Sequence, residues 1–287
     1  MILENKIDLY AYFGVKRPEG AKGYMNAYIT ERFDEYSAKR VRPAMIVFPG
    51  GGYWFRSERE AQPIALNYAV NGFQTFVVEY TVESESPNAH HPVMLIEAAM
   101  AVAYVRENAD KYFIQKDKIA IIGFSAGGHL AGSISTMFGD ENIVNALKEK
   151  AALCRPDASV LCYPVITFIH PTHGGTRDAC TNHNPALFEA LSVEKNVTEN
   201  TPPTFIWSTY EDNCVPIINS VLMAEALAEN KVPFELHIFR KGYHGLSLCN
   251  DETSKDGVDA INPVAEEWLK MSVTFLRELG FKVRNEE

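Results

Sequence analysis

The sequence predicts an α/β protein whose mostly parallel sheet is covered by helices on both faces. Short runs of β-branched and aromatic residues, such as "AMIVFP" at 44–49 and "KIAIIGF" at 118–124, alternate with stretches of helical periodicity. These runs are almost continuously apolar, which is typical of strands that are buried on both faces. Their alternation with helices indicates a parallel sheet between two helical layers.

Seven strands and five helices can be placed along the chain. Strands are expected at 24–30, 44–49, 74–80, 118–124, 158–164, 204–210 and 234–239. Helices are expected at Ile64–Val70, Val93–Lys111, Ile217–Glu229 and Val264–Leu279, and one more begins just after Ser125. No Pro/Gly/Ser-rich linker and no repeat divides the sequence, so we expect a single domain over residues 1–287.

Composition and charge narrow the range of partners. The chain contains 27 Lys plus Arg and 37 Asp plus Glu, which gives a formal net charge of −10. This acidic balance argues against nucleic acid as a partner, because binding to its phosphates needs a basic face. The apolar residues fall in short runs, and none approaches the roughly 20 apolar residues that a membrane helix needs. We therefore expect neither a nucleic-acid nor a membrane partner.

The amino terminus and the cysteines favour a cytoplasmic protein. The stretch "MILENKIDLYAYFG" carries early charges and has no apolar segment of secretory length. The five cysteines are odd in number and include no C-x-x-C pair. A reduced compartment fits this pattern better than a disulfide framework does.

The stretch "IAIIGFSAGGHLAG" places one serine in a tight turn between a predicted strand and a predicted helix. Gly123 and Gly127 flank Ser125 in a G-x-S-x-G pattern. Small residues on both sides let neighbouring backbone pass close by, and the strained turn lifts the hydroxyl out of the sheet. At the amino end of the helix, free backbone N–H groups favour a developing negative charge. We therefore predict that Ser125 is a nucleophile.

A serine nucleophile needs a general base and an acid that orients this base. Asp212 follows the strand in "TFIWSTYEDNCVP", and His244 lies between two glycines in "FRKGYHGLSL", after a late strand. The order Ser, Asp, His is the one that such a turn predicts. Glu211 is the alternative acid, and we favour Asp212. The other histidines weighed as bases lack the late, glycine-flanked setting: His90, His91, His129 (expected to pack or cap) and His237.

Three consecutive glycines follow the early strand in "IVFPGGGYWFRSERE". Without side chains in the way, their backbone N–H groups can point into a site. Gly51 and Gly52, together with the backbone N–H of Ala126, form the predicted oxyanion hole. Tyr53 and Trp54 come next, and each is either an apolar or sugar-stacking wall of the site or part of the core.

These motifs together resemble a known family. "PGGGY", "GFSAGGHLAG", "CYPVITF", "PPTFIWSTYEDNCVP" and "KGYHGLSL" are similar to motifs of the α/β-hydrolase fold esterases of the acetyl xylan esterase and feruloyl esterase-like (BD-FAE-like) group, in register from about Ala44 onward. The resemblance implies an eight-stranded, mostly parallel sheet, no cofactor, and hydrolysis of short acyl esters, often on plant-derived sugars. It also implies that Ser125, Asp212 and His244 are nucleophile, acid and base. The related HGGG loop has a histidine where this chain has proline, but the donors are backbone groups.

The predicted function is that of a serine esterase. It would remove short acyl groups, O-acetyl groups on sugars or oligosaccharides in particular, through an acyl-enzyme. A serine peptidase or amidase with the same triad is one alternative. A non-catalytic ligand-binding homologue is another, although such homologues usually lack a member of the triad. The pattern allows a homodimer without requiring one.

The polar segment at about 165–203 has no clear secondary structure, and we expect it to form a short, loop-like cap that rims the site. His170, His173, Cys180 and His183 could be written as a zinc set, because imidazole and thiolate suit that ion. The family that the chain resembles does not depend on metal. We therefore expect a substrate-facing rim without a metal site, and a packed loop is the alternative.

Overall fold

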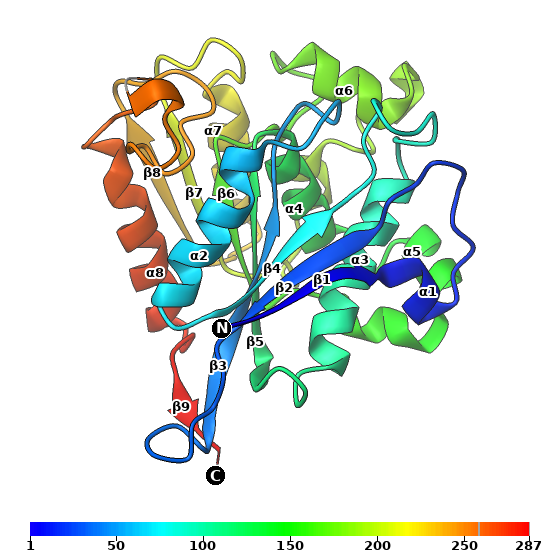
Figure 1. Ribbon diagram of the computed structural model, residues 1–287. Helices are drawn as coiled ribbons and strands as arrows, with labels where there is room; N and C mark the ends of the chain where they lie inside the picture. Colours follow the sequence, from blue (N-terminus) through cyan, green and yellow to red (C-terminus); the bar gives the residue numbers. More distant parts are fainter. Residues whose placement is uncertain (258, 287) are drawn as a thin grey trace.

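The computed structural model describes residues 1–257 and 259–286, which are organised around a central sheet (Figure 1). Its strands are β1 (Ile2–Asp8), β2 (Tyr24–Ile29), β3 (Arg40–Phe48), β4 (Gln74–Glu79), β5 (Ile114–Phe124), β6 (Ala158–Cys162), β7 (Thr204–Thr209), β8 (Phe234–Phe239) and β9 (Arg284–Asn285). Eight of them follow the order β1-β2-β4-β3-β5-β6-β7-β8, and the short β9 pairs with the start of β3.

Six neighbouring strands of the sheet are parallel to one another: β4, β3, β5, β6, β7 and β8. At one edge, β2 pairs with β4 in the antiparallel direction, and β1 pairs with β2 in the same way. The carboxyl ends of the parallel strands therefore lie together along one rim of the sheet. The predicted α/β-hydrolase fold with a mostly parallel eight-stranded path is confirmed, and β9 is an addition to it.

The helices form two layers. They are α1 (Leu9–Phe13), α2 (Gln62–Val70), α3 (Val93–Glu107), α4 (Ala126–Thr136), α5 (Glu141–Leu147), α6 (Gly174–Thr181), α7 (Ile218–Glu229) and α8 (Trp268–Glu278). Short 3₁₀ turns lie at Glu58–Glu60, Lys148–Leu153, Pro185–Leu187, Val193–Asn196, Lys255–Gly257 and Ala265–Glu267. Among the described residues, no helix is long and apolar enough to cross a lipid bilayer.

The strands are apolar throughout because each face of the sheet has its own core. Successive residues of β5 alternate between the two cores, with Ile119 and Ile121 on one side and Ala120 and Ile122 on the other. Helices α3, α4, α5 and α7 contribute to the first core, and α2 and α8 contribute to the second. Figure 1 shows α2 and α8 together in front of the sheet.

The structure adds α1, α5, β1 and β9 to the predicted elements, and it also differs from the prediction in the segment at about 165–203. The edge strand β1 was not expected, because its residues are mostly polar and exposed and carry no apolar pattern. The segment at about 165–203 is not a loop-like cap, since it contains α6 and two 3₁₀ turns, at Pro185–Leu187 and Val193–Asn196. Helix α6 starts with two glycines and is capped by His173, so it lacks the usual signals of a helix start. Figure 1 shows α6 above the carboxyl ends of the central strands.

Candidate active site

Ser125 connects β5 to α4 through a strained backbone conformation. Its φ is 52° and its ψ is −116°, values that L-residues rarely adopt. The flanking glycines make this turn possible: a Cβ on Gly123 would lie 2.1 Å from the carbonyl oxygen of Gly127. A Cβ on Gly127 would in turn lie 2.2 Å from the carbonyl oxygen of Phe48 on β3. The amide of Ser125 donates to the carbonyl of Cys162 at 3.0 Å, which ties the turn to β6.

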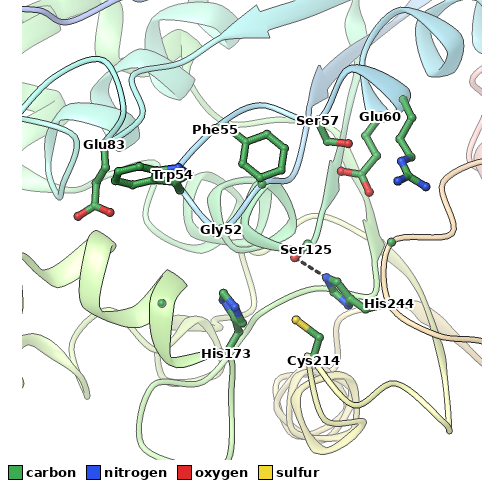
Figure 2. Close-up of a pocket in the computed structure, with 14 residues that line it drawn as sticks. Gly52, Trp54, Phe55, Ser57, Glu60, Glu83, Ser125, His173, Cys214 and His244 are labelled. Atoms are coloured by element: carbon green, nitrogen blue, oxygen red, sulfur yellow. Dashed lines mark hydrogen bonds between the residues drawn. The ribbon is translucent and has the colours of Figure 1, made fainter. Parts of the chain in front are cut away.

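His244 joins Ser125 to Asp212 (Figure 2). Its Nε2 lies 2.7 Å from Ser125 Oγ, and its Nδ1 lies 2.7 Å from Asp212 Oδ2. The Asp212 side chain is 1% exposed, and its Oδ1 accepts hydrogen bonds from the amides of Cys214 and Val215 at 2.8 and 2.9 Å. Since the carboxylate accepts the Nδ1 proton, the neutral imidazole presents a lone pair on Nε2 to the serine hydroxyl.

The alternative acid and the alternative bases lie elsewhere. Glu211 faces the amide of Gly242 at 3.4 Å and forms no hydrogen bond with His244 among the described residues. His237 pairs with Glu235 within β8. Neither His90, His91 nor His129 lines the pocket that contains Ser125.

The glycine loop lies beside Ser125 and keeps free backbone donors. Gly51 and Gly52 have φ values of +123° and +65°, and both line the same pocket as Ser125. A Cβ on Gly51 would lie 2.0 Å from the carbonyl oxygen of Phe55, so no other residue fits there. Within residues 1–257 and 259–286, the amides of Gly51, Gly52 and Ala126 donate to no protein acceptor. These three amides can therefore serve a ligand.

The two aromatic residues after the glycines have different environments. Tyr53 is buried, and its hydroxyl lies 2.9 Å from Nδ1 of His129. The Nε2 of His129 contacts the carbonyl of Leu191 at 2.9 Å, and burial lowers the pKa of this histidine to about 4. Tyr53 and His129 are thus parts of the core, as the packing alternative stated. Trp54, in contrast, is 58% exposed and lines the pocket.

A buried network behind the site escaped the sequence analysis. Glu60 accepts a hydrogen bond from the amide of Gly50 at 2.9 Å and another from the hydroxyl of Tyr163 at 2.6 Å. The same hydroxyl accepts from the amide of Ser247 at 2.9 Å, and the Tyr163 ring packs edge-on against His244 with a centroid distance of 5.1 Å. Burial raises the pKa of Glu60. The network links the glycine loop to the loop of the histidine.

These residues enclose a pocket of about 510 Å³. Its lining comes from the glycine loop, the turn at β5, the start of α6 and the loops after β4, β7 and β8. The lining residues are Gly51, Gly52, Trp54, Phe55, Ser57, Arg59, Glu60, Glu83, Ser125, His173, Gly175, Cys214, His244 and Gly245. Figure 2 shows the labelled side chains around a common space, with Ser125 and His244 on one side of it.

The residues of the zinc alternative are not brought together. His173 lines the pocket, whereas Cys180 is buried and His183 is exposed. No three His, Cys, Asp or Glu side chains form a group that could hold a metal ion in the part of the chain that the structure describes. Of the four residues, His173 alone lines this pocket, as expected for a substrate-facing rim.

Comparison with known proteins identifies the family of the chain. The BD-FAE family model matches residues 33–227, more than half of the chain. Endo-1,4-beta-xylanase B of Butyrivibrio fibrisolvens is 41% identical over 214 residues, which are 74% of this chain and 33% of that protein. Acetylxylan esterase of Xylanibacter ruminicola is 29% identical over 71% of this chain and 41% of its own length. The chain thus spans well under half of the length of these two curated relatives.

Solved structures match over nearly the whole chain. The acetyl ester-xyloside bifunctional hydrolase from Caldicellulosiruptor lactoaceticus is 37% identical, with a TM-score of 0.75 over 90% of this chain and 89% of that one. The carboxylesterase Cest-2923 from Lactobacillus plantarum is 27% identical, with a TM-score of 0.86 over 99% of this chain and all of that one. The chain therefore belongs to the BD-FAE family and has the α/β-hydrolase fold.

Proposed function

We propose that this protein is a serine esterase that removes acetyl and other short acyl groups from hydroxyl-rich alcohols, in particular from xylose-based oligosaccharides. The observation that carries the proposal is the connected set of Ser125, His244 and Asp212, with both hydrogen bonds at 2.7 Å, in the wall of a pocket. The substrate class rests on similarity to an acetylxylan esterase and to an acetyl ester-xyloside hydrolase.

In the first half of the proposed reaction, Ser125 attacks the ester carbonyl while His244 accepts the hydroxyl proton at Nε2. Asp212 holds the imidazole in the required tautomer and stabilises its positive charge. The carbonyl oxygen becomes an oxyanion, and the free amides of the glycine loop and of Ala126 are its proposed donors. When the tetrahedral intermediate collapses, His244 protonates the departing alcohol and an acyl-enzyme remains.

In the second half, water takes the place of the alcohol. His244 removes a proton from the water molecule, which attacks the acyl carbon and passes through a second oxyanion at the same donors. Collapse returns the proton to Ser125 and releases the carboxylic acid. Apart from substrate and water, the scheme uses only side chains and backbone amides of this chain.

The experiment that tests the proposal compares three substrates: an acetylated xylo-oligosaccharide, an aryl acetate and the matching aryl acetamide. We expect acetate release from both esters, much slower cleavage of the amide, and loss of all three activities in Ser125→Ala. An amide that is cleaved faster than the esters would contradict the esterase assignment and favour a peptidase or amidase. Absence of hydrolysis of any substrate by the wild-type protein would contradict the catalytic proposal as a whole.

A further inference from the structure

His173 lines the pocket, and its hydrogen bonds determine which ring nitrogen carries the proton. Its Nδ1 accepts from the amide of Thr176 at 3.1 Å and lies 2.8 Å from the hydroxyl of the same residue, as the cap of α6. An imidazole nitrogen that accepts from a backbone amide carries no proton, so the proton of the neutral ring is on Nε2. This Nε2 has no protein partner within the described residues.

The position of His173 is opposite the glycine loop. A Cβ placed on Gly52 would lie 3.5 Å from Cε1 of His173, an ordinary van der Waals distance. Figure 2 shows the imidazole across the pocket from Gly52, on the same side of the view as Cys214. Burial, together with the neighbouring His244, lowers the pKa of His173, which keeps the ring neutral at neutral pH. A substrate bound at Ser125 therefore meets an N–H donor here.

Trp54 provides a flat apolar surface that is held rigidly to the same loop. Its amide donates to the carbonyl of Gly51 at 3.0 Å, and its carbonyl accepts from the amide of Ser84 at 3.2 Å. The side chain is nevertheless 58% exposed and lines the pocket. An indole ring fixed at its backbone and open on one side suits stacking against the C–H face of a sugar ring.

Glu83 provides a free acceptor at the same end of the pocket. Its amide donates to the carbonyl of Tyr53 at 2.9 Å, so the two segments are held together. Its side chain is exposed and lines the pocket, and within residues 1–257 and 259–286 it forms no ion pair and no hydrogen bond. Figure 2 shows the Glu83 carboxylate next to the indole of Trp54. A sugar hydroxyl can donate to such a carboxylate, and its oxygen can accept from an N–H group.

We propose that Trp54, Glu83 and His173 form a subsite for the alcohol half of the substrate, which binds a pyranose ring with free hydroxyl groups beside the esterified one. The indole supports the ring, the carboxylate accepts from one hydroxyl, and Nε2 of His173 donates to another. This subsite rests on the proposed esterase function and assigns its substrate selectivity. An aryl ester has no hydroxyl groups for Glu83 and His173, so it gains less from the subsite.

The test measures kcat/KM for a monoacetylated xylopyranoside and for an aryl acetate in four test variants and one control variant. Trp54→Ala removes the stacking surface, and Glu83→Gln removes the charge of the acceptor. His173→Asn keeps a residue that caps a helix well but removes the Nε2 donor, whereas His173→Ala removes both. Phe33→Ala, an exposed aromatic residue that does not line the pocket, is the matched control for Trp54→Ala.

The readout is the ratio of kcat/KM for the sugar ester to kcat/KM for the aryl ester. We expect this ratio to fall by about tenfold in Trp54→Ala and by about three- to tenfold in His173→Asn and Glu83→Gln, mainly through KM for the sugar ester, as expected for the loss of a stacking contact or a hydrogen bond. A ratio that stays within about twofold of the wild-type value in all four test variants would overturn the subsite while the esterase function stands. If the wild-type protein hydrolyses neither the sugar ester nor the aryl ester, the esterase function on which the subsite rests is overturned.

Discussion

At the scale of single residues, the site depends on a serine whose backbone is held in an unfavourable conformation. A non-glycine residue at φ 52° and ψ −116° costs about 1–3 kcal/mol, so its surroundings must stabilise the turn. The hydrogen bond from Ser125 to Cys162 and the close backbone contacts at Gly123 and Gly127 do so. The turn places Oγ 2.7 Å from Nε2 of His244, and this is the positioning that nucleophilic catalysis needs.

We expect Asp212→Asn to lower kcat by about four orders of magnitude, the loss known for the equivalent change in a serine protease triad. The asparagine can still accept from the amides of Cys214 and Val215, so the fold should persist, but its amide group favours the wrong imidazole tautomer. Steady-state kinetics on an aryl acetate measure the effect. Glu211→Gln is the matched control, and a larger loss in that variant would mean that the acid is misassigned.

Tyr163→Phe should lower the free energy of unfolding by about 1–3 kcal/mol, because buried Glu60 and the amide of Ser247 would each lose a hydrogen-bond partner. Urea denaturation measures this change. Tyr210→Phe is the control, since the Tyr210 side chain is 68% exposed and its hydroxyl forms no hydrogen bond among the described residues. Equal stability of the two variants would show that the network behind the site contributes nothing to the fold.

Sequence reasoning located Ser125, Asp212, His244 and the glycine loop because each lies in a short motif at the end of a strand. The geometry agrees with that placement, although the chemical roles remain predictions. Glu60 escaped because the stretch "SERE" is indistinguishable from an exposed polar turn. Its buried carboxylate is hydrogen-bonded to Tyr163, about one hundred residues later in the chain. A local sequence pattern cannot predict a contact between residues so far apart.

At the scale of secondary-structure elements, the sequence predicts the central strands but neither the edge strand β1 nor the short helix α6. Strands buried on both faces must be apolar throughout, and the sequence shows this directly. Strand β1 has one face in water and little apolar surface, and α6 is a short helix with two glycines at its start. Both elements depend on partners that the local sequence does not specify, so propensity alone could not reveal them.

Helix α3 carries a buried carboxyl that couples three elements. Glu97 accepts hydrogen bonds from the hydroxyl of Tyr10 on α1 and from the amide and hydroxyl of Thr81, just after β4. Burial raises the pKa of this carboxyl from about 4.5 to about 7, and the hydrogen bonds from Thr81 and Tyr10 oppose part of this effect. The folded state therefore binds the proton of Glu97 more tightly than the unfolded state does.

From this pKa, we predict a pH-dependent effect of Glu97→Gln on stability. The tighter proton binding stabilises the fold below about pH 4.5, and this contribution, on the order of 3 kcal/mol, is lost as pH rises through about 7. The variant should therefore gain stability relative to the wild type between about pH 5 and pH 8. His129, whose pKa is lowered to about 4, acts in the opposite direction but equally in both proteins. Urea denaturation across this range measures the difference, and a constant difference would refute the prediction.

At the scale of the whole molecule, the shape and lining of the pocket limit the acyl group. A long acyl chain gains roughly 0.8 kcal/mol for each CH₂ that an apolar trough buries. Among the described residues, no Leu, Ile, Val or Met lines the pocket, and its apolar side chains are Trp54, Phe55 and Cys214. The helical segment that contains α6 contributes His173 and Gly175 rather than an apolar surface.

We therefore predict that kcat/KM on aryl esters is highest for acetyl to butyryl groups and falls sharply by octanoyl. A series of aryl esters with increasing acyl length, measured at constant pH, tests this prediction. A control series with one acyl group and different aryl alcohols separates the effect of the acyl half from that of the leaving group. If kcat/KM is higher for octanoyl or longer esters than for the acetate, the pocket accepts long acyl chains and the protein is closer to the lipases.

The central claim is that Ser125 is the nucleophile of an esterase, and covalent labelling tests it most directly. The protein is treated with an activated aryl phosphonate, its residual hydrolysis of an aryl acetate is followed, and its mass and peptides are analysed by mass spectrometry. We predict that activity disappears as one phosphonate is attached per chain, on the peptide that contains Ser125, and that folded Ser125→Ala takes up none. Attachment at another residue, or hydrolysis that continues in Ser125→Ala, would contradict the account.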